Sequence, residues 1–324
     1  MPGRRLRIVA LGLGPIGRAV CREIVGAHDL ELVGAVDPAP GLAGKDLARI
    51  VGGGTARGAR VAASVGELRG RKPDVIAHLS ASRFPEAARQ IREILPLGVP
   101  VVSTCEELIA APWRWPKEAR SLDRAAKKAG VAVLATGVNP GFVMDVLPAA
   151  LANVCVDVRK VHVTRHVDTS TRRGALQAKT GAGITRAEFR KRKKEGRIGH
   201  VGLRDSLIFL MNHLPLEGEV GEETLKPILA AEDIRRGKVT VEQGAVAGVH
   251  QTVKATAPGG RKAVATFDQK MAFGLADPHD EIRFEGDPPL RIRIEDGVPG
   301  DRATVGSVLS TLRFATDAPA GLGF

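Results

Sequence analysis

The stretch LRIVALGLGPIG, residues 6–17, decides the fold of this chain. Its first half is an apolar run that predicts a buried strand. The glycines that follow form a Gly-x-Gly-x-x-Gly pattern, which opens a stretch with apolar residues at helical spacing. In this arrangement the first glycine permits a tight turn, the second lets a pyrophosphate approach the backbone, and the third lets the helix pack on the sheet. The residues that we expect to contact a dinucleotide here are Gly12, Gly14, Pro15, Ile16 and Gly17.

A carboxylate follows at the end of the next predicted strand, residues 31–36. Asp37 lies 20 residues after Gly17, where dinucleotide-binding domains hold the ribose hydroxyls. Its negative charge would repel a 2′-phosphate, so we expect NAD as the cofactor. Lys45 or Arg49 on the following loop leaves NADP possible.

The composition is that of an ordinary globular chain of 324 residues, with 44% hydrophobic and 26% charged residues. A net charge of +12 is compatible with a nucleic-acid partner, but aromatic residues make up 3% and tyrosine is absent, so platforms for stacking bases are scarce. The densest basic run, residues 186–197, is interpreted as the solvated face of a helix. We therefore expect no nucleic-acid partner.

The sequence also argues against membrane insertion, metal binding and disulfides. No apolar stretch is long enough to span a bilayer, and the apolar run after Arg4 and Arg5 is broken by glycines and a proline, unlike a secretory signal. The histidines and cysteines have no metal-ligand spacing. Cys21, Cys105 and Cys155 are odd in number and widely spaced, so we expect a cytoplasmic protein.

The first half of the chain alternates short apolar runs with helical stretches, which predicts an α/β Rossmann domain with a doubly wound parallel sheet. The expected strands are residues 6–11, 31–36, 74–79, 99–102 and 131–135, with helices at 85–95 and 117–129.

The second half changes period. Strands with alternating apolar and polar residues and a Pro-Gly-Gly turn at 258–260 predict an α+β domain on a mixed or antiparallel open sheet. The helical stretch 303–314 is expected to pack back onto the first domain. We therefore expect an NAD(P)-binding Rossmann domain at residues 1–138 plus 300–324, and an α+β domain for substrate binding and dimerisation at 139–299. The open sheet favours a homodimer.

Ligands of doubly wound sheets bind beyond the carboxyl ends of the strands. Three polar segments follow predicted strands there, at residues 79–82, 103–107 and 136–141. The residues of the first two segments that we expect to contact the cofactor are Ser80, Ala81, Ser82, Thr104 and Cys105.

The middle segment carries two adjacent carboxylates. Glu106 directly follows the turn and is expected to face the crevice, whereas Glu107 is interpreted as a helix-start residue with Ser103 or Thr104 as the cap. Alcohol oxidation often uses Tyr, His or Lys, and this chain has no tyrosine. Amine oxidation passes through a cationic iminium, which a carboxylate stabilises. Glu106 therefore favours oxidoreduction at a C–N bond. A neighbouring carboxylate raises the pKa of Cys105, which argues against a nucleophilic role.

Five segments together resemble the 2,4-diaminopentanoate dehydrogenases and the related native amine dehydrogenases. They are GLGPIG, the AVDP ending with GKDL after it, VVSTCEEL, TGVNPGFVMD and RHVDTSTRRGALQAKTGAG. The resemblance runs from about residue 5 to 189 and resumes near 301–322, while the region 200–300 matches only in general layout. The family shares a dihydrodipicolinate-reductase-like N-terminal domain. The HH…K…DAPSG pattern of the true reductases is missing here, which argues against lysine biosynthesis.

The resemblance implies NAD(P)-dependent oxidative deamination of a small amine or diamino acid, and the reverse reductive amination of a ketone or aldehyde with ammonia. It assigns the acid/base role to Glu106 and places Asn139 and Pro140 beside the nicotinamide. Two alternatives stay open: an oxidoreductase of the same fold that acts on a semialdehyde or imine, and a non-catalytic dinucleotide sensor. A polar segment with Asp168, Arg172, Gln177 and Lys179 belongs either to an interdomain or dimer network or to the substrate site.

Overall fold

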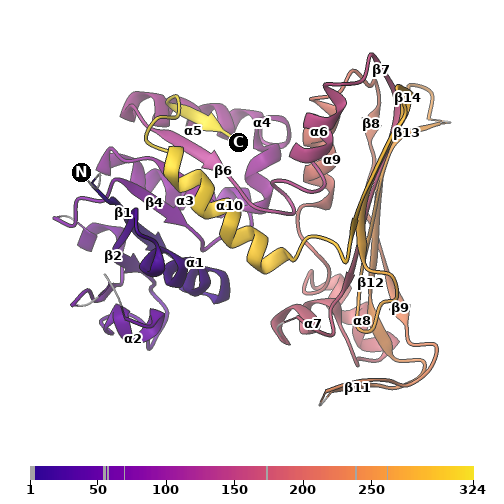
Figure 1. Cartoon of the computed structure of the whole chain (residues 1–324), viewed down its shortest axis with the longest axis horizontal. Helices are drawn as coiled ribbons and strands as arrows, with labels where there is room; N and C mark the ends of the chain where they lie inside the picture. Colours follow the sequence, from indigo (N-terminus) through magenta and orange to yellow (C-terminus); the bar gives the residue numbers. More distant parts are fainter. Residues whose placement is uncertain are drawn as a thin grey trace. The chain divides into compact units, whose positions relative to one another are not determined.

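The computed structural model describes residues 4–53, 56, 58–68, 70–172, 174–237, 239–260 and 262–324. The chain forms two compact units. Unit 1 comprises Met1–Gly141 with Pro299–Phe324, and unit 2 comprises Phe142–Val298. Each unit is built on its own sheet (Figure 1). In the parts of the chain that are described, no helix is long and apolar enough to cross a membrane.

Unit 1 has a parallel sheet of seven strands in the order β16-β6-β5-β4-β1-β2-β3. The sequence order reverses on the two sides of β1, because β2 pairs with one edge of it and β4 with the other. Such a switch point leaves a crevice at the carboxyl ends of the strands. The strands are β1 (Leu6–Leu11), β2 (Leu30–Val36), β3 (Val61–Ala62), β4 (Val75–His78), β5 (Val101–Ser103), β6 (Ala132–Ala135) and β16 (Gly321–Gly323).

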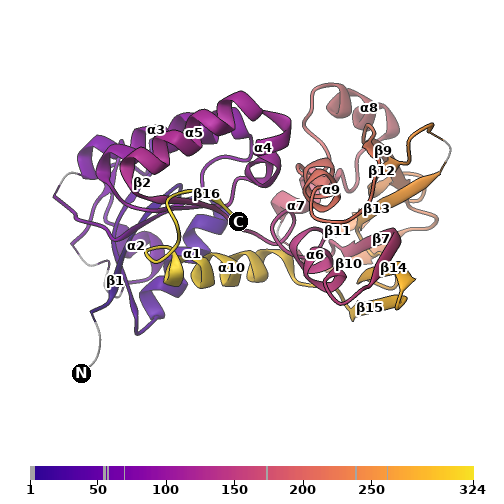
Figure 2. The same cartoon turned by 90° about the horizontal axis from the view of Figure 1, so that it is seen from above.

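Helices cover both faces of this sheet, with α1 and α10 on one side and α3 and α5 on the other (Figure 2). Val20 of α1 and Val308 of α10 lie in one buried cluster, and Ile91 of α3 and Leu122 of α5 lie in the other. The predicted doubly wound fold is therefore confirmed. The helices are α1 (Pro15–Gly26), α2 (Leu47–Val51), α3 (Phe84–Ile94), α4 (Ala111–Arg114), α5 (Pro116–Ala129) and α10 (Gly300–Phe314), with 3-10 turns η2 (Val65–Leu68), η3 (Leu95–Leu97) and η4 (Glu106–Ala110).

The return of the last helix to the first domain is also confirmed. Two ion pairs fix α10 to unit 1, Arg302 with Glu23 at 2.6 Å and Arg313 with Asp29 at 2.7 Å. The chain then adds β16 beside β6. The sequence did not predict this strand of three residues, because it is too short to carry a period.

Unit 2 contains a mixed sheet in the order β15-β14-β7-β13-β12-β8, with β9 also paired to β12. β7 runs parallel to β13, and the other described neighbours are antiparallel. The strands are β7 (Asp157–Asp168), β8 (Glu219–Val220), β9 (Thr224–Leu229), β12 (Val246–Thr256), β13 (Ala263–Ala272), β14 (His279–Asp287) and β15 (Leu290–Glu295), and a separate pair is β10 (Ile234–Arg236) with β11 (Val239–Val241). The predicted hairpin around residues 258–260 is β12–β13.

The helices of unit 2 are α6 (Val146–Ala152), α7 (Gly174–Thr180), α8 (Arg186–Lys194) and α9 (Leu203–Met211). The sheet alternates in burial along β7, where Val161 and Val163 are fully buried while His162 is half-buried on the opposite face. Helix α8 buries Phe189 and exposes most of its basic side chains, so the interpretation of residues 186–197 as a solvated helix face is confirmed.

Candidate functional site

The glycine turn after β1 has the local geometry that a dinucleotide requires. Gly12 has a φ of 100°, and a Cβ atom there would lie 2.8 Å from the Leu79 carbonyl oxygen. A Cβ on Gly17 would lie 2.0 Å from the Gly12 carbonyl oxygen, so helix α1 approaches the turn too closely for any side chain. A Cβ on Gly14 would meet nothing within 4 Å. The backbone at Gly14 is therefore open to a ligand at the amino end of α1, where unpaired N–H groups favour phosphate.

A cavity of about 460 Å³ lies at the glycine turn, and its volume is within the usual range for small-molecule sites. A second cavity, of about 360 Å³, lies in unit 2. The cavity at the glycine turn sits at the switch point between β1, β2 and β4. It brings together four of the predicted cofactor residues: Gly12, Gly14, Asp37 and Ser80. Its other lining residues are Leu11, Val36, Pro38, Ala63, Ser64, Val65, Leu79, Glu86, Arg89, Gln90 and Glu93.

Asp37 is held in place by the backbone on both sides of the cavity. One carboxylate oxygen accepts the Leu13 N–H at 2.8 Å and the other accepts the Ala39 N–H at 2.9 Å. A carboxylate oxygen has two acceptor sites, so each can still accept a ribose hydroxyl. Lys45 and Arg49, the residues that left NADP possible, are not among those that line the cavity. The open backbone at Gly14 and the fixed carboxylate both fit a nicotinamide dinucleotide.

One wall of the cavity was missed from the sequence. Glu86, Arg89, Gln90 and Glu93 come from the polar face of α3. Their spacing of three, four and seven residues along a predicted helix after a strand end is a signal that would have found them. Arg89 is paired with Glu93 at 2.7 Å, so the only cation on this wall is already neutralised among the described residues.

The two adjacent carboxylates after β5 have different environments. Glu107 is buried, and its Oε1 accepts a hydrogen bond from Arg83 at 2.6 Å and lies 3.6 Å from Arg114. Its Oε2 accepts the Phe84 N–H at 2.8 Å, at the first residue of α3. Glu107 therefore caps a neighbouring helix from its own position in the first turn of η4.

The prediction that Ser103 or Thr104 caps η4 is wrong. The cap position is Cys105, without a side-chain hydrogen bond, because the Ser103 hydroxyl is turned into the sheet toward His78. The Cys105 side chain is buried in the apolar core on the α3 and α5 face. Burial, then the charges of Glu106 and Glu107, raises the pKa of Cys105 to about 12, so a thiolate nucleophile is excluded at neutral pH.

Glu106 occupies the first position of η4 and is half-buried. It follows the end of β5 by three residues, at the same edge of the sheet as the ends of β1 and β4 that form the cavity. The geometry therefore presents one partly exposed carboxylate at the ligand-binding edge, while the next carboxylate along the chain is committed to α3.

The turn after β6, residues 136–141, depends on two glycines. A Cβ on Gly137 would lie 2.5 Å from the Pro140 carbonyl oxygen, and one on Gly141 would lie 2.6 Å from the Gly137 nitrogen. The Thr136 hydroxyl is bonded to Ser307 at 2.7 Å and to Thr311 at 2.9 Å, both on α10. This tight turn places Asn139, half-buried, and Pro140, buried, at the sheet edge.

The remaining predicted cofactor residues do not line the cavity at the glycine turn. Pro15 begins α1, and Ile16 packs against the core. The loop between β4 and α3 contains Ala81 and Ser82, and the Ser82 carbonyl accepts the Glu107 N–H at 3.3 Å. The predicted residues that are outside the lining are Pro15, Ile16, Gly17, Ala81, Ser82, Thr104, Cys105, Asn139 and Pro140.

The polar segment after β7 forms a network inside unit 2. Asp168 accepts N–H bonds from Ser170 and Gly274, both at 2.9 Å. The Gln177 amide donates to the carbonyls of Thr169 and Arg172, both at 3.0 Å, and so holds the loop that leads into α7. Asp168 and Gln177 are thus explained by local structure.

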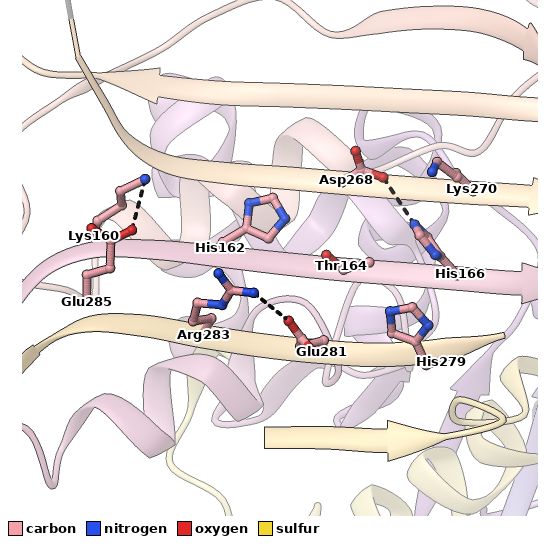
Figure 3. Close-up of a pocket in the computed structure, with 10 residues that line it drawn as sticks. All are labelled: Lys160, His162, Thr164, His166, Asp268, Lys270, His279, Glu281, Arg283 and Glu285. Atoms are coloured by element: carbon pink, nitrogen blue, oxygen red, sulfur yellow. Dashed lines mark hydrogen bonds and ion pairs between the residues drawn. The ribbon is translucent and has the colours of Figure 1, made fainter. Parts of the chain in front are cut away.

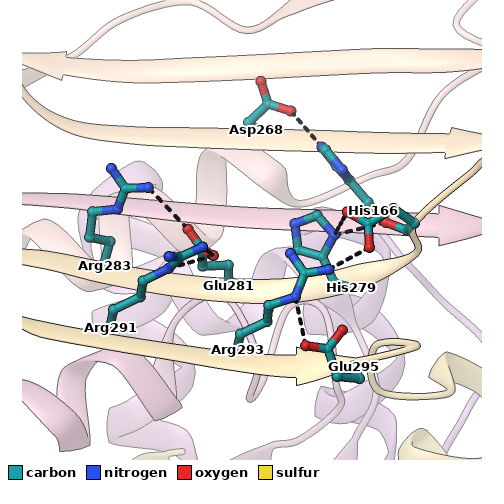
Figure 4. A network of polar contacts seen from close by, with 9 residues as sticks. His166, Asp268, His279, Glu281, Arg283, Arg291, Arg293 and Glu295 are labelled. Atoms are coloured by element: carbon teal, nitrogen blue, oxygen red, sulfur yellow. Dashed lines mark hydrogen bonds and ion pairs between the residues drawn. The ribbon is translucent and has the colours of Figure 1, made fainter.

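The second cavity lies on the polar face of the unit 2 sheet (Figure 3). Its charges are largely paired across neighbouring strands: Lys160 with Glu285 at 3.0 Å, Glu281 with Arg291 at 2.7 Å, and Asp268 with His250 at 3.0 Å. Figure 4 shows the pair of Glu281 with Arg291 of the edge strand β15, on which Arg293 also pairs with Glu295. Its lining residues are Lys160, His162, Thr164, His166, Asp268, Lys270, His279, Glu281, Arg283 and Glu285. The charges on this face are therefore largely neutralised by ion pairs within the chain.

Comparisons with known proteins agree with this geometry. A family model described as the 2,4-diaminopentanoate dehydrogenase C-terminal domain matches residues 142–323. The region 200–300, which was expected to match only in general layout, lies inside that match. The 2,4-diaminopentanoate dehydrogenase of Acetoanaerobium sticklandii is 27% identical over 330 residues, which cover 98% of this chain and 86% of that protein.

Two solved structures have the same fold. An amine dehydrogenase from Mycobacterium smegmatis matches with a TM-score of 0.82 at 21% identity, covering 99% of this chain and 95% of that one. The WlbA dehydrogenase from Bordetella pertussis, in complex with NADH and UDP-GlcNAcA, matches with a TM-score of 0.53 at 16% identity, covering 98% and 91% of the two chains.

Proposed function

We propose that this chain is a dehydrogenase of a small amine or diamino acid, with Glu106 as its acid/base. The chain belongs to the 2,4-diaminopentanoate dehydrogenase family. Its enzyme class is that of an NAD(P)-dependent oxidoreductase acting on CH–NH₂ groups. The observation that carries the assignment of Glu106 is that the two adjacent carboxylates after β5 have different environments. Glu107 is buried against Arg83 and α3, while Glu106 is half-buried at the ligand-binding edge.

The chemistry follows from the charge of the reacting carbon. The bound dinucleotide supplies the hydride acceptor, and loss of hydride from an amine carbon leaves a cationic iminium on the substrate. A fixed carboxylate stabilises that cation and takes a proton from the attacking water. Overall, the C–H and C–N bonds break, water supplies the carbonyl oxygen, ammonium leaves and one proton is released. In reverse, ammonia condenses with a ketone or aldehyde, Glu106 donates the proton that lets water leave, and the iminium carbon would accept hydride from the reduced dinucleotide.

The preferred cofactor is NAD. Asp37 supports this preference, because its carboxylate is fixed by two backbone N–H groups in the cavity wall. Glu86 and Glu93 add negative charge to the same cavity, and Arg89 is paired with Glu93. A 2′-phosphate placed there would meet negative charge without a free cation from the described lining residues.

The proposed partners are the amine or carbonyl substrate, ammonia and a second copy of the chain. The homodimer is proposed because the unit 2 sheet is open; the charges on its polar face are already paired within the chain and do not decide the question. Light scattering after size-exclusion chromatography tests this state, and a monomeric mass at micromolar concentration would remove the dimer from the proposal.

The test of function is the variant Glu106→Gln, which keeps size and polarity but removes charge and proton transfer. Reduction of NAD is followed with a panel of amines and a panel of alcohols at alkaline pH. We expect turnover with amines, and a loss on the order of 100- to 10,000-fold in Glu106→Gln with dinucleotide affinity nearly unchanged. Near-normal turnover in this variant would remove Glu106 from the chemistry. Turnover with alcohols alone would remove the amine assignment.

A further inference from the structure

The interior of unit 1 contains a chain of hydrogen bonds that the proposed reaction does not use. His78, the last residue of β4, is fully buried. Its Nδ1 lies 2.8 Å from the Ser103 hydroxyl at the end of β5, and its Nε2 lies 2.7 Å from the Gln90 amide oxygen on α3. Gln90 and Ser80 line the dinucleotide cavity, and the Ser80 hydroxyl donates to the same Gln90 oxygen at 2.7 Å.

The orientation of the Gln90 amide sets the direction of the bonds in this chain, and the Ser80 hydroxyl lies a longer 3.4 Å from the His78 Nε2. The Gln90 Nε2 donates to the Glu86 carboxylate at 3.3 Å, so the Gln90 oxygen must face the imidazole. His78 Nε2 therefore bears the proton and donates to that oxygen. Nδ1 must then accept from the Ser103 hydroxyl. The Ser103 oxygen in turn accepts the Cys105 N–H at 3.2 Å.

The two ends of the chain lie at different parts of the site. One end is the Gln90 and Ser80 wall of the cavity. The other is the backbone of Cys105, the residue immediately before Glu106. Burial lowers the pKa of His78 to about 4, with the Gln90 bond opposing it, so the neutral imidazole that this chain needs is present throughout the neutral range.

We propose that His78 is a positioning residue that joins the dinucleotide cavity to the turn that presents Glu106. The imidazole does so with two separate hydrogen bonds, one for each side. The first part of this inference, that His78 supports the cavity wall through Gln90, depends on the cavity alone. The second part, that His78 supports the turn before Glu106 through Ser103, rests on the proposed function. A histidine that merely filled space in the core would show no such division between its two nitrogens.

Two conservative variants separate these two parts. The side-chain oxygen of His78→Asn can replace Nδ1 as the acceptor for Ser103, but it cannot reach Gln90. The amide of His78→Gln can replace Nε2 as the donor to Gln90, but it cannot serve Ser103. We measure the dissociation constant of NADH by its fluorescence, the hydrogen-exchange rate of the Cys105 amide by NMR, and kcat with an amine.

We expect His78→Asn to weaken NADH binding about fivefold, the usual value of one net hydrogen bond, with normal Cys105 exchange and normal kcat. We expect His78→Gln to bind NADH normally, to exchange the Cys105 amide several-fold faster and to lose kcat. ¹⁵N-labelled His78 should report the Nε2–H tautomer from pH 8 to pH 5. Leu30→Ala, which removes a buried side chain at the amino end of β2, away from the ligand-binding edge, is the control for stability loss without either effect.

The inference fails if, in both variants, NADH affinity and Cys105 exchange change together and by an amount that follows the loss of stability. It also fails if His78 has the Nδ1–H tautomer. It is supported if the two readouts separate, even when the unmodified protein oxidises no amine. In that case the proposed function is wrong, while the link between the cavity and the turn remains.

Discussion

The clearest quantitative prediction concerns Glu107, the carboxylate to which the proposed function gives no chemical role. In Glu107→Gln, one carboxylate oxygen becomes an amide NH₂ group next to the Arg83 guanidinium, which can only donate. The Arg83 side chain is 58% exposed and that of Glu107 is 3% exposed. The ion pair is therefore worth about 1 kcal/mol or less after solvent screening. The buried bond from the Phe84 N–H to a charged oxygen is worth roughly 1.5–3 kcal/mol.

The variant keeps a neutral acceptor for Phe84, so about 1–1.5 kcal/mol of that bond is lost. Together with the ion pair, we expect a total loss of about 1–2.5 kcal/mol. For a unit of this size, about 2–4 °C of Tm follows each kcal/mol, which gives a decrease of roughly 2–10 °C. Thermal unfolding followed by circular dichroism, with a urea titration beside it, measures the change. Residual turnover at 20 °C should stay within about threefold of the unmodified protein, because the side chain only positions α3.

Glu106→Gln is the matched control, because it makes the same chemical change one residue earlier at a half-buried position. Its Tm should fall less than that of Glu107→Gln, because its side chain is half-buried whereas that of Glu107 is buried, while its turnover collapses. The reasoning is refuted if Glu107→Gln unfolds at the same temperature as the unmodified protein, or if Glu106→Gln is the less stable of the two.

Three further predictions follow from other parts of the chain. Asp37→Ser should raise kcat/KM with NADP relative to NAD by at least tenfold, and a strong NADP preference in the unmodified protein would contradict the role of Asp37. Duplex DNA titrated at physiological ionic strength should form no tight complex, because we interpret the basic run of α8, in which Arg192 already pairs with Glu188, as a solvated helix face and not as a phosphate-binding one; submicromolar, salt-sensitive binding would contradict this. Burial opposes ionisation of Asp268, but hydrogen bonds from His166 and His250 lower its pKa from 3.8 to about 2. This depressed pKa means that about 2 kcal/mol of stability is present above pH 4 and is lost as the pH falls to 2. Asp268→Asn should show no such loss in that window by acid titration.

The parts of the fold that the sequence predicted are those encoded over a short window. β1 was predicted with its observed bounds, Leu6–Leu11, because a buried apolar run ends there at Gly12, whose φ of 100° other residues rarely adopt. Gly12, Gly14 and Asp37 could be assigned to the same cavity because a local motif fixes all three. β3, with two residues, carries too little pattern to be predicted.

The parts that the sequence missed depend on contacts between distant segments. His78 looks like one more residue of a buried strand, and only the packing of α3 and β5 against it reveals its two partners. The role of Glu107 is similar: its position after β5 predicts a helix start, but the helix that it caps begins at residue 84. Local pattern gives the type of element, whereas the partner of a buried polar group is a property of the assembled fold.

The short 3-10 helix after β5 determines how many carboxylates the reaction can use. With about 3.0 residues per turn, consecutive side chains on such a helix are separated by about 120°. Glu106 and Glu107 therefore cannot face the same ligand, and Arg83 and the start of α3 already hold Glu107. The geometry therefore does not bring both carboxylates to the same ligand. Of the two carboxylates after β5, only Glu106 is left to face the ligand-binding edge, and in the proposed reaction its one negative charge stabilises one cationic iminium.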